Sequence, residues 1–87
     1  GVQKIALYTD GTANYIDAGN LAIGSTTAAA KLDVNGGIRM ADDATAASAT
    51  NVGTQRYRTS GNNSYVDMCM QTGSSTYEWI NILENNW

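Results

Sequence analysis

The chain has 87 residues, a formal net charge of −3, no histidine, no proline and a single cysteine. One cysteine excludes an intrachain disulfide, and scattered lysines and arginines argue against a nucleic-acid ligand, whose phosphates call for clustered positive charge. The absence of histidine removes the commonest general base and metal ligand, so we expect no enzyme activity, no metal and no cofactor. No apolar stretch reaches the roughly 18 to 20 residues of a membrane span, so we expect no membrane insertion.

The apolar residues of this chain are mostly small. Hydrophobic residues make up 43% of the chain, and 12 of them are alanine; the others are 17 valine, isoleucine, leucine and methionine residues, seven aromatic residues and the single cysteine. A chain of this kind buries little apolar area, so the entropy of ordering its backbone is hard to offset in a single copy. Oligomerisation is the usual remedy where disulfides and metals are missing.

Glycine recurs with asparagine, aspartate, serine and threonine between short alternating segments, which is typical of an all-β fold. The expected strands are 3–8, 13–17, 20–24, 31–34, 37–41, 53–58, 64–71 and 77–83. Residues 41–51 have no large side chain, which permits either one or two helical turns, capped by Asp42 or Asp43, or close packing at a three-fold axis. We therefore divide the chain into a stalk, 1–40, a small-residue neck, 41–51, and a tip, 52–87.

Side-chain parity predicts a hairpin in the stalk. A three-residue loop over 35–37, with Gly37 in the left-handed region, places apolar residues on one face and opposite charges on the other. The predicted pairs are Val34 with Ile38, Leu32 with Met40, and Asp33 with Arg39. The alternative is that these strands run on around a three-fold axis and pair between chains.

The same argument predicts a three-stranded meander in the tip. With 73–75 as the loop, the pairs are Met68 with Ile80, Val66 with Ile82, Cys69 with Trp79, and Gln71 with Tyr77. One face then carries Val66, Met68, Met70, Ile80 and Ile82. The other carries Tyr65, Cys69, Tyr77, Trp79 and Leu83, joined by Tyr57 opposite Tyr65 if the preceding turn centres on Gly61 and Asn62. Two apolar faces cannot both remain wet, so the stalk end or neighbouring subunits must cover at least one.

Two stretches resemble a known family. Residues 21–40, LAIGSTTAAAKLDVNGGIRM, resemble the stalk repeat of trimeric phage tail fibres and of fibre-like bacterial adhesins. Residues 48–57, SATNVGTQRY, with the later strand STYEWINI at 75–82, are similar to the small tip domains of the same proteins. The resemblance implies an intertwined homotrimeric β stalk followed by a small antiparallel β-meander tip. It also implies an extracellular, surface-exposed fibre, on a virion tail or a bacterial cell, that adheres to a cell-surface glycan or protein receptor.

For such a trimer we expect a core of nine residues: Leu32, Val34, Ile38, Met40, Val66, Met68, Met70, Ile80 and Ile82. Cys69 lacks a basic neighbour that would activate it and is expected to be a buried free thiol. Asp67 and Glu78, the nearest carboxylates for glycoside hydrolysis, fall on opposite faces in the predicted register. We therefore predict no catalytic residues.

Aromatic side chains give the functional prediction, because sugar rings stack their CH faces on tryptophan and tyrosine. The candidate ligand-binding residues are Tyr57, Arg58, Asn62, Asn63, Tyr65, Tyr77 and Trp79. The alternative is that this aromatic cluster is the seam between subunits, which leaves loops 59–63 and 72–76 as the ligand contacts.

Two functions remain open at this point. The first is the distal part of a homotrimeric fibre with a multivalent binding tip. The second is a monomeric or dimeric β-sandwich carbohydrate-binding module of a larger enzyme. The chain starts in the middle of a pattern, at Gly1 and Val2, so we expect it to be a fragment of a longer protein.

Overall fold

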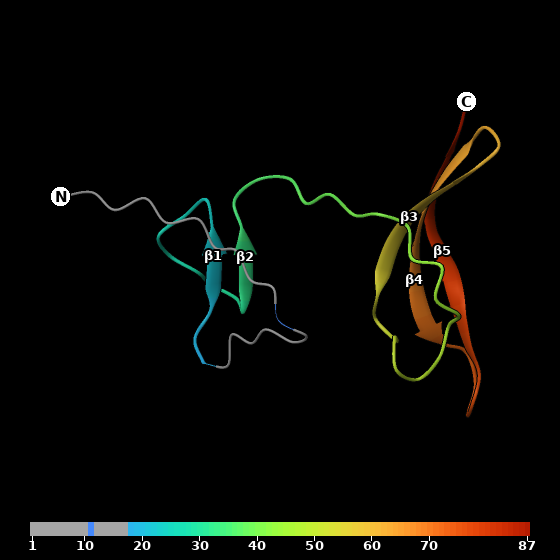
Figure 1. Ribbon diagram of the computed structural model, residues 1–87, viewed down its shortest axis with the longest axis horizontal. Helices are drawn as coiled ribbons and strands as arrows, with labels where there is room; N and C mark the ends of the chain where they lie inside the picture. Colours follow the sequence, from blue (N-terminus) through green and yellow to red (C-terminus); the bar gives the residue numbers. More distant parts are fainter. Residues whose placement is uncertain (1–10, 12–17) are drawn as a thin grey trace. The chain divides into compact units, whose positions relative to one another are not determined.

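Five β-strands make up the regular structure in the computed structural model, which describes residue 11 and residues 18–87 (Figure 1). These described residues contain no helix, so the all-β prediction is confirmed for them. It follows that none of them belongs to a helix that could cross a membrane. The chain divides into two units, one ending at Ile38 and one beginning at Arg39. The strands expected at 3–8 and 13–17 lie outside the described residues.

The first unit contains two short parallel strands, β1 (Leu21–Ile23) and β2 (Leu32–Val34). The ladder continues past the strands, because the Asn35 N–H donates to the Ile23 carbonyl at 2.8 Å. Apolar residues lie beside one another in this register, Leu21 beside Leu32 and Ile23 beside Val34. These two strands, both predicted from their alternation, are therefore parallel partners, and a connection of eight residues joins them.

The turn after β1 requires a glycine. Gly24 has a φ of 79°, in the left-handed region, and a Cβ atom at this position would lie 2.9 Å from the Asn35 carbonyl oxygen. The Asn35 side-chain amide in turn donates to the Gly24 carbonyl at 3.2 Å. Both the backbone conformation and the available space exclude a larger side chain.

The stalk hairpin predicted around 35–37 does not form within this chain. β2 pairs with β1 instead, and residues 37–41 are not a strand. Gly37 does not adopt a positive φ, and the Asp33 carboxylate accepts a hydrogen bond from the Ala29 N–H at 3.0 Å rather than pairing with Arg39. Both pairings align apolar residues with apolar residues; the parallel one also lets the Asp33 carboxylate close the connecting turn through the Ala29 N–H.

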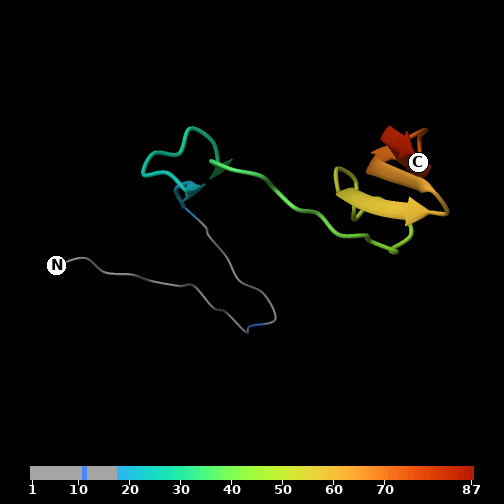
Figure 2. The same cartoon turned by 90° about the horizontal axis from the view of Figure 1, so that it is seen from above.

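The second unit is a three-stranded antiparallel sheet in the order β3-β4-β5, as the meander prediction requires (Figure 2). Its strands are β3 (Gln55–Ser60), β4 (Asn63–Gln71) and β5 (Tyr77–Asn86). Three predicted pairs are confirmed: Met68 with Ile80, Cys69 with Trp79, and Gln71 with Tyr77. The fourth is wrong, because a β-bulge shifts the register between Val66 and Asp67. One extra residue in β5 puts Leu83, not Ile82, opposite Val66.

The predicted position of Tyr57 is also wrong. Ser60 pairs with Asn63, so the turn consists of two residues, and Gly61 takes a φ of 58° in it. This turn places Tyr57 opposite Val66, on the aliphatic side of the sheet. The turn centres on Gly61 and Asn62, as expected, but a two-residue turn there pairs Tyr57 with Val66 and not with Tyr65. This shift of one position exchanges the two faces of β3.

Residues 41–51 form no helix; we call them the cover segment because they run across one face of the sheet (Figure 1). The Tyr57 N–H donates to the Ala41 carbonyl at 3.1 Å, which attaches the start of this segment to the edge of β3. Near its end, the Asn51 side chain accepts from the Ser48 N–H at 2.8 Å and donates to the Ala46 carbonyl at 3.1 Å. Polar side chains here bond the nearby backbone, which competes with the helical bonds that the alanine content permits.

Candidate functional site

The sheet of the second unit has two chemically different faces, which follow from the alternation of side chains along each strand. The covered face, beneath the cover segment, carries Arg56, Arg58, Tyr65, Asp67, Cys69, Tyr77 and Trp79. The open face carries Tyr57, Val66, Met68, Met70, Ile80 and Leu83. Asp67 and Glu78 lie on opposite faces, as predicted.

Asp67 is the centre of the covered face. Its side chain is only 1% exposed and its Oδ2 atom accepts hydrogen bonds from Arg56 Nε at 2.9 Å and from Arg58 Nε at 2.5 Å. Burial by itself would raise the pKa of Asp67, but the hydrogen bonds from Arg58 and Arg56 outweigh it, so the pKa lies below its ordinary value. The same contact raises the pKa of Arg58. The buried carboxylate is therefore ionised and holds two arginines in place.

Each of these arginines also lies over an aromatic ring. The guanidinium carbon of Arg56 is 4.0 Å from the centroid of the Trp79 ring, and that of Arg58 is 4.0 Å from the centroid of the Tyr65 ring. Such cation–π contacts stabilise a cation against the ring face. One face of each ring is therefore already occupied, and neither is a fully open stacking platform.

The cover segment is attached to the covered face by hydrogen bonds. Arg56 Nη1 donates to the Asp43 carbonyl at 2.8 Å, and the Trp79 indole Nε1 donates to the Thr45 carbonyl at 2.9 Å. Cys69, the fully buried free thiol that we expected, donates to Asn51 Oδ1 at 3.2 Å. The segment thus covers the aromatic side of the sheet with backbone carbonyls and small side chains.

The structure brings some of the predicted ligand-binding residues together and separates others. Arg58, Tyr65, Tyr77 and Trp79 share the covered face, whereas Tyr57 is on the open face. Asn62 lies in the β3–β4 turn and Asn63 begins β4. Sequence reasoning missed the role of Asp67 as the partner of both arginines. A sequence signal for this role is present: the aspartate faces two arginines at alternate positions of the neighbouring strand, and it shares a face of the sheet with the buried cysteine.

The residues predicted for a trimer core also have mixed surroundings. Val66, Met68, Met70 and Ile80 are half-buried on the open face, and Val34 and Met40 are half-buried in their own segments. Ile82, at the bulge, is 51% exposed, and Leu32 and Ile38 are 56% and 70% exposed. Leu83, which takes the place expected for Ile82, is 66% exposed.

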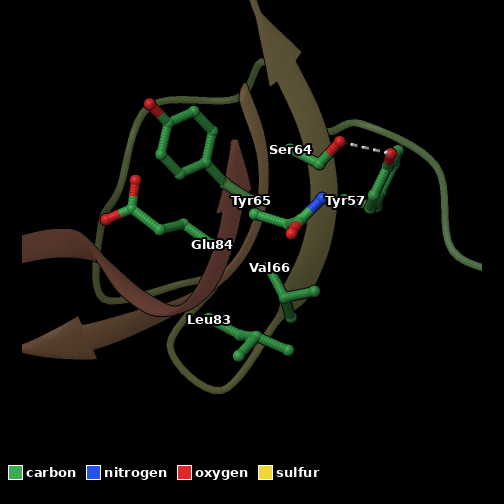
Figure 3. Close-up of a pocket in the computed structure, with 7 residues that line it drawn as sticks. Tyr57, Ser64, Tyr65, Val66, Leu83 and Glu84 are labelled. Atoms are coloured by element: carbon green, nitrogen blue, oxygen red, sulfur yellow. Dashed lines mark hydrogen bonds between the residues drawn. The ribbon is translucent and has the colours of Figure 1, made fainter. Parts of the chain in front are cut away.

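The open face contains a small pocket of about 130 Å³ near the β3–β4 turn (Figure 3). Val66 and Leu83 lie next to each other in this pocket, and the Tyr57 hydroxyl donates to Ser64 Oγ at 2.9 Å at its side. The remaining lining residues are Ser64, Tyr65, Glu84 and Asn85. The volume is below the several hundred Å³ of a typical small-molecule site.

The described residues contain no group of three or more cysteine, aspartate or glutamate side chains that could hold a metal ion. In comparisons with known proteins, no family model, no curated protein and no solved structure matches this chain.

Proposed function

We propose that this chain is the distal part of a homotrimeric fibre that presents a multivalent receptor- or glycan-binding tip. The open face carries this proposal. The hydrogen bonds between the cover segment and the sheet go to the covered face and to the edge of β3, which leaves the apolar residues of the open face half-buried or exposed. Among the described residues only Asp67 and Cys69 are buried, so one copy of the second unit lacks an aliphatic core.

The energetics support self-association through this face. Fully burying a valine, leucine, isoleucine or methionine side chain contributes roughly 1.5 to 3 kcal/mol. The open-face residues are already partly buried, so closing the face contributes on the order of 5 to 10 kcal/mol per chain, before the entropy cost of association. Among the described residues, the strand register places one charged residue, Glu78, on this face, at its end, and Glu84 lines the pocket beside the β3–β4 turn, so the middle of the face is uncharged and copies can approach without strong repulsion.

In this arrangement the opposite side of the sheet faces outward. The Arg58 side chain is 31% exposed and lies over the Tyr65 ring, close to the β3–β4 turn, where polar residues suit adaptable recognition. Three identical weak sites on one rigid fibre raise the effective concentration of the tip at a surface. The proposed partners are two further copies of the chain and a cell-surface glycan or protein receptor, with no nucleic acid, membrane insertion or catalysis. The proposed location is a virion tail or a bacterial surface.

The test is the mass of the protein in dilute solution by light scattering, followed by a glycan array on the same sample. We expect the mass of three chains. A folded single chain would contradict the fibre and favour the alternative, a carbohydrate-binding module of a larger enzyme.

A further inference from the structure

The cover segment is attached to the sheet in an unusual way. Between Ala41 and Asn51 it has no aliphatic or aromatic side chain larger than alanine, so it makes no apolar anchor on the sheet. Among the described residues, its attachments to the sheet are the bond from the Tyr57 N–H at the edge of β3 and the bonds to Arg56, Trp79 and Cys69 described above. Water can replace bonds of this kind when they break, so the segment can lift without exposing large side chains of its own.

The surface beneath it offers three kinds of contact. Arg56 Nη1 and Trp79 Nε1 are donors whose present partners are carbonyl oxygens of the cover segment. The Trp79 ring is an aromatic surface of which Arg56 occupies one face. Asp67 Oδ1 is a buried acceptor that has no hydrogen-bond partner among the described residues.

These contacts match the chemistry of a pyranose sugar. Its ring has an apolar CH face that stacks on an indole, and its hydroxyl groups both donate and accept hydrogen bonds. The hydroxyl oxygens can take the place of the cover carbonyls on Arg56 and Trp79. A hydroxyl hydrogen can satisfy Asp67 Oδ1, and a buried acceptor left unpaired is costly.

We propose that Arg56, Asp67 and Trp79 form a carbohydrate subsite that the cover segment closes, so that sugar binds only when the segment has lifted. This inference rests on the proposed function for its choice of a glycan as ligand. It adds that the site is gated within each chain. The apparent association constant of this subsite for sugar equals its intrinsic association constant multiplied by the fraction of molecules in which the cover segment has lifted.

Cys69 makes the gate measurable. It is the only cysteine of the chain, it is buried, and it bonds Asn51 Oδ1 in the closed state. The rate at which a thiol reagent labels it therefore reports how often the cover segment lifts. Asn51→Ala removes the side-chain bonds to Cys69, Ser48 and Ala46, and we expect this loss to raise the labelling rate by about tenfold.

The experiment compares the full chain, its Asn51→Ala variant and a control variant, Asn86→Ala, at the exposed end of β5. Each is labelled at Cys69 and titrated by calorimetry with cellohexaose, hexa-N-acetylchitohexaose and hexagalacturonate. We expect Asn51→Ala to raise the labelling rate and the affinity for at least one of these sugars by the same factor. The control should change neither. Hydrogen exchange of the β4 amides verifies that the sheet of the variant remains folded.

Faster labelling without a gain in sugar affinity would overturn the proposal, as would an unchanged labelling rate or no binding of any of the three sugars. If exchange shows that the β4 amides of Asn51→Ala are unprotected, Thr45→Gly, which loosens the cover backbone, takes its place with the same criteria. The light-scattering mass of the same samples tests the fibre separately. A monomer that shows the matched gain contradicts the fibre and leaves the gated site supported.

Discussion

Replacing Asp67 by asparagine tests whether the buried ion pairs hold the covered face together. Asparagine has nearly the same size but no charge, so Arg56 and Arg58 lose their shared anion while the packing changes little. Breaking a buried ion pair by removing one partner costs about 3 to 5 kcal/mol. The Arg58 side chain is 31% exposed and regains water, so we discount this figure to roughly 2 to 4 kcal/mol.

The assay is urea unfolding followed by tryptophan fluorescence, which senses the Arg56 contact with the Trp79 ring. The matched control is Glu78→Gln, which also removes one carboxylate but on an exposed position of the open face. We expect the control to change the free energy of unfolding by less than about 0.5 kcal/mol. A loss below about 1 kcal/mol for Asp67→Asn would refute the role given to this ion pair.

Three further outcomes are expected. The pKa of Asp67 is lowered in the folded state, so its contribution to stability is fully present above about pH 4 and is lost as the pH falls through the folded pKa. The difference in free energy of unfolding between the native chain and Asp67→Asn should therefore shrink below about pH 4, measured by urea unfolding at a series of acid pH values. Met68→Asp puts a charge in the middle of the open face and should reduce the light-scattering mass from three chains to one, whereas Thr50→Asp, on the exposed cover segment, should leave it unchanged. Gly24→Ala should destabilise the β1–β2 pair by roughly 1 to 3 kcal/mol, measured by hydrogen exchange, because residue 24 has a positive φ and no room for a Cβ. Gly37 has neither constraint, so an equal loss of stability in Gly37→Ala would contradict this reasoning.

The regular elements of the second unit could be predicted closely because their signals are local. Alternation and the loop at 73–75 were enough to pair Met68 with Ile80 and Cys69 with Trp79. The bulge at Val66 carries no comparable local signal, and it moved the pairing of β5 beyond it by one position. The turn at Gly61 and Asn62 was expected, but its length of two residues pairs Tyr57 with Val66 rather than with Tyr65. Because side chains alternate with period two, a shift of one position exchanges the faces of a strand. Tyr57 therefore lies on the open face and not on the aromatic face that was predicted for it.

The stalk segment shows the opposite situation. The strands around Ile23 and Val34 were recognised, but their partners were not, because a hairpin and a parallel pairing satisfy the same alternation. The choice between them depends on contacts across eleven residues of sequence, Leu21 on Leu32, rather than on the glycines that suggested the turn. Short strands with small side chains specify their register weakly.

The sequence by itself determined that the chain is all-β over the described residues, that Cys69 is a buried thiol, and that the tip sheet has one aliphatic and one aromatic face. These properties follow from composition and period-two alternation. Only the tertiary structure decided that the cover segment closes the aromatic face and that Asp67 joins two arginines beneath it. A segment of alanine, serine, threonine and aspartate has no side-chain pattern that selects a surface, so its place depends on which donors the folded sheet presents to its carbonyl groups.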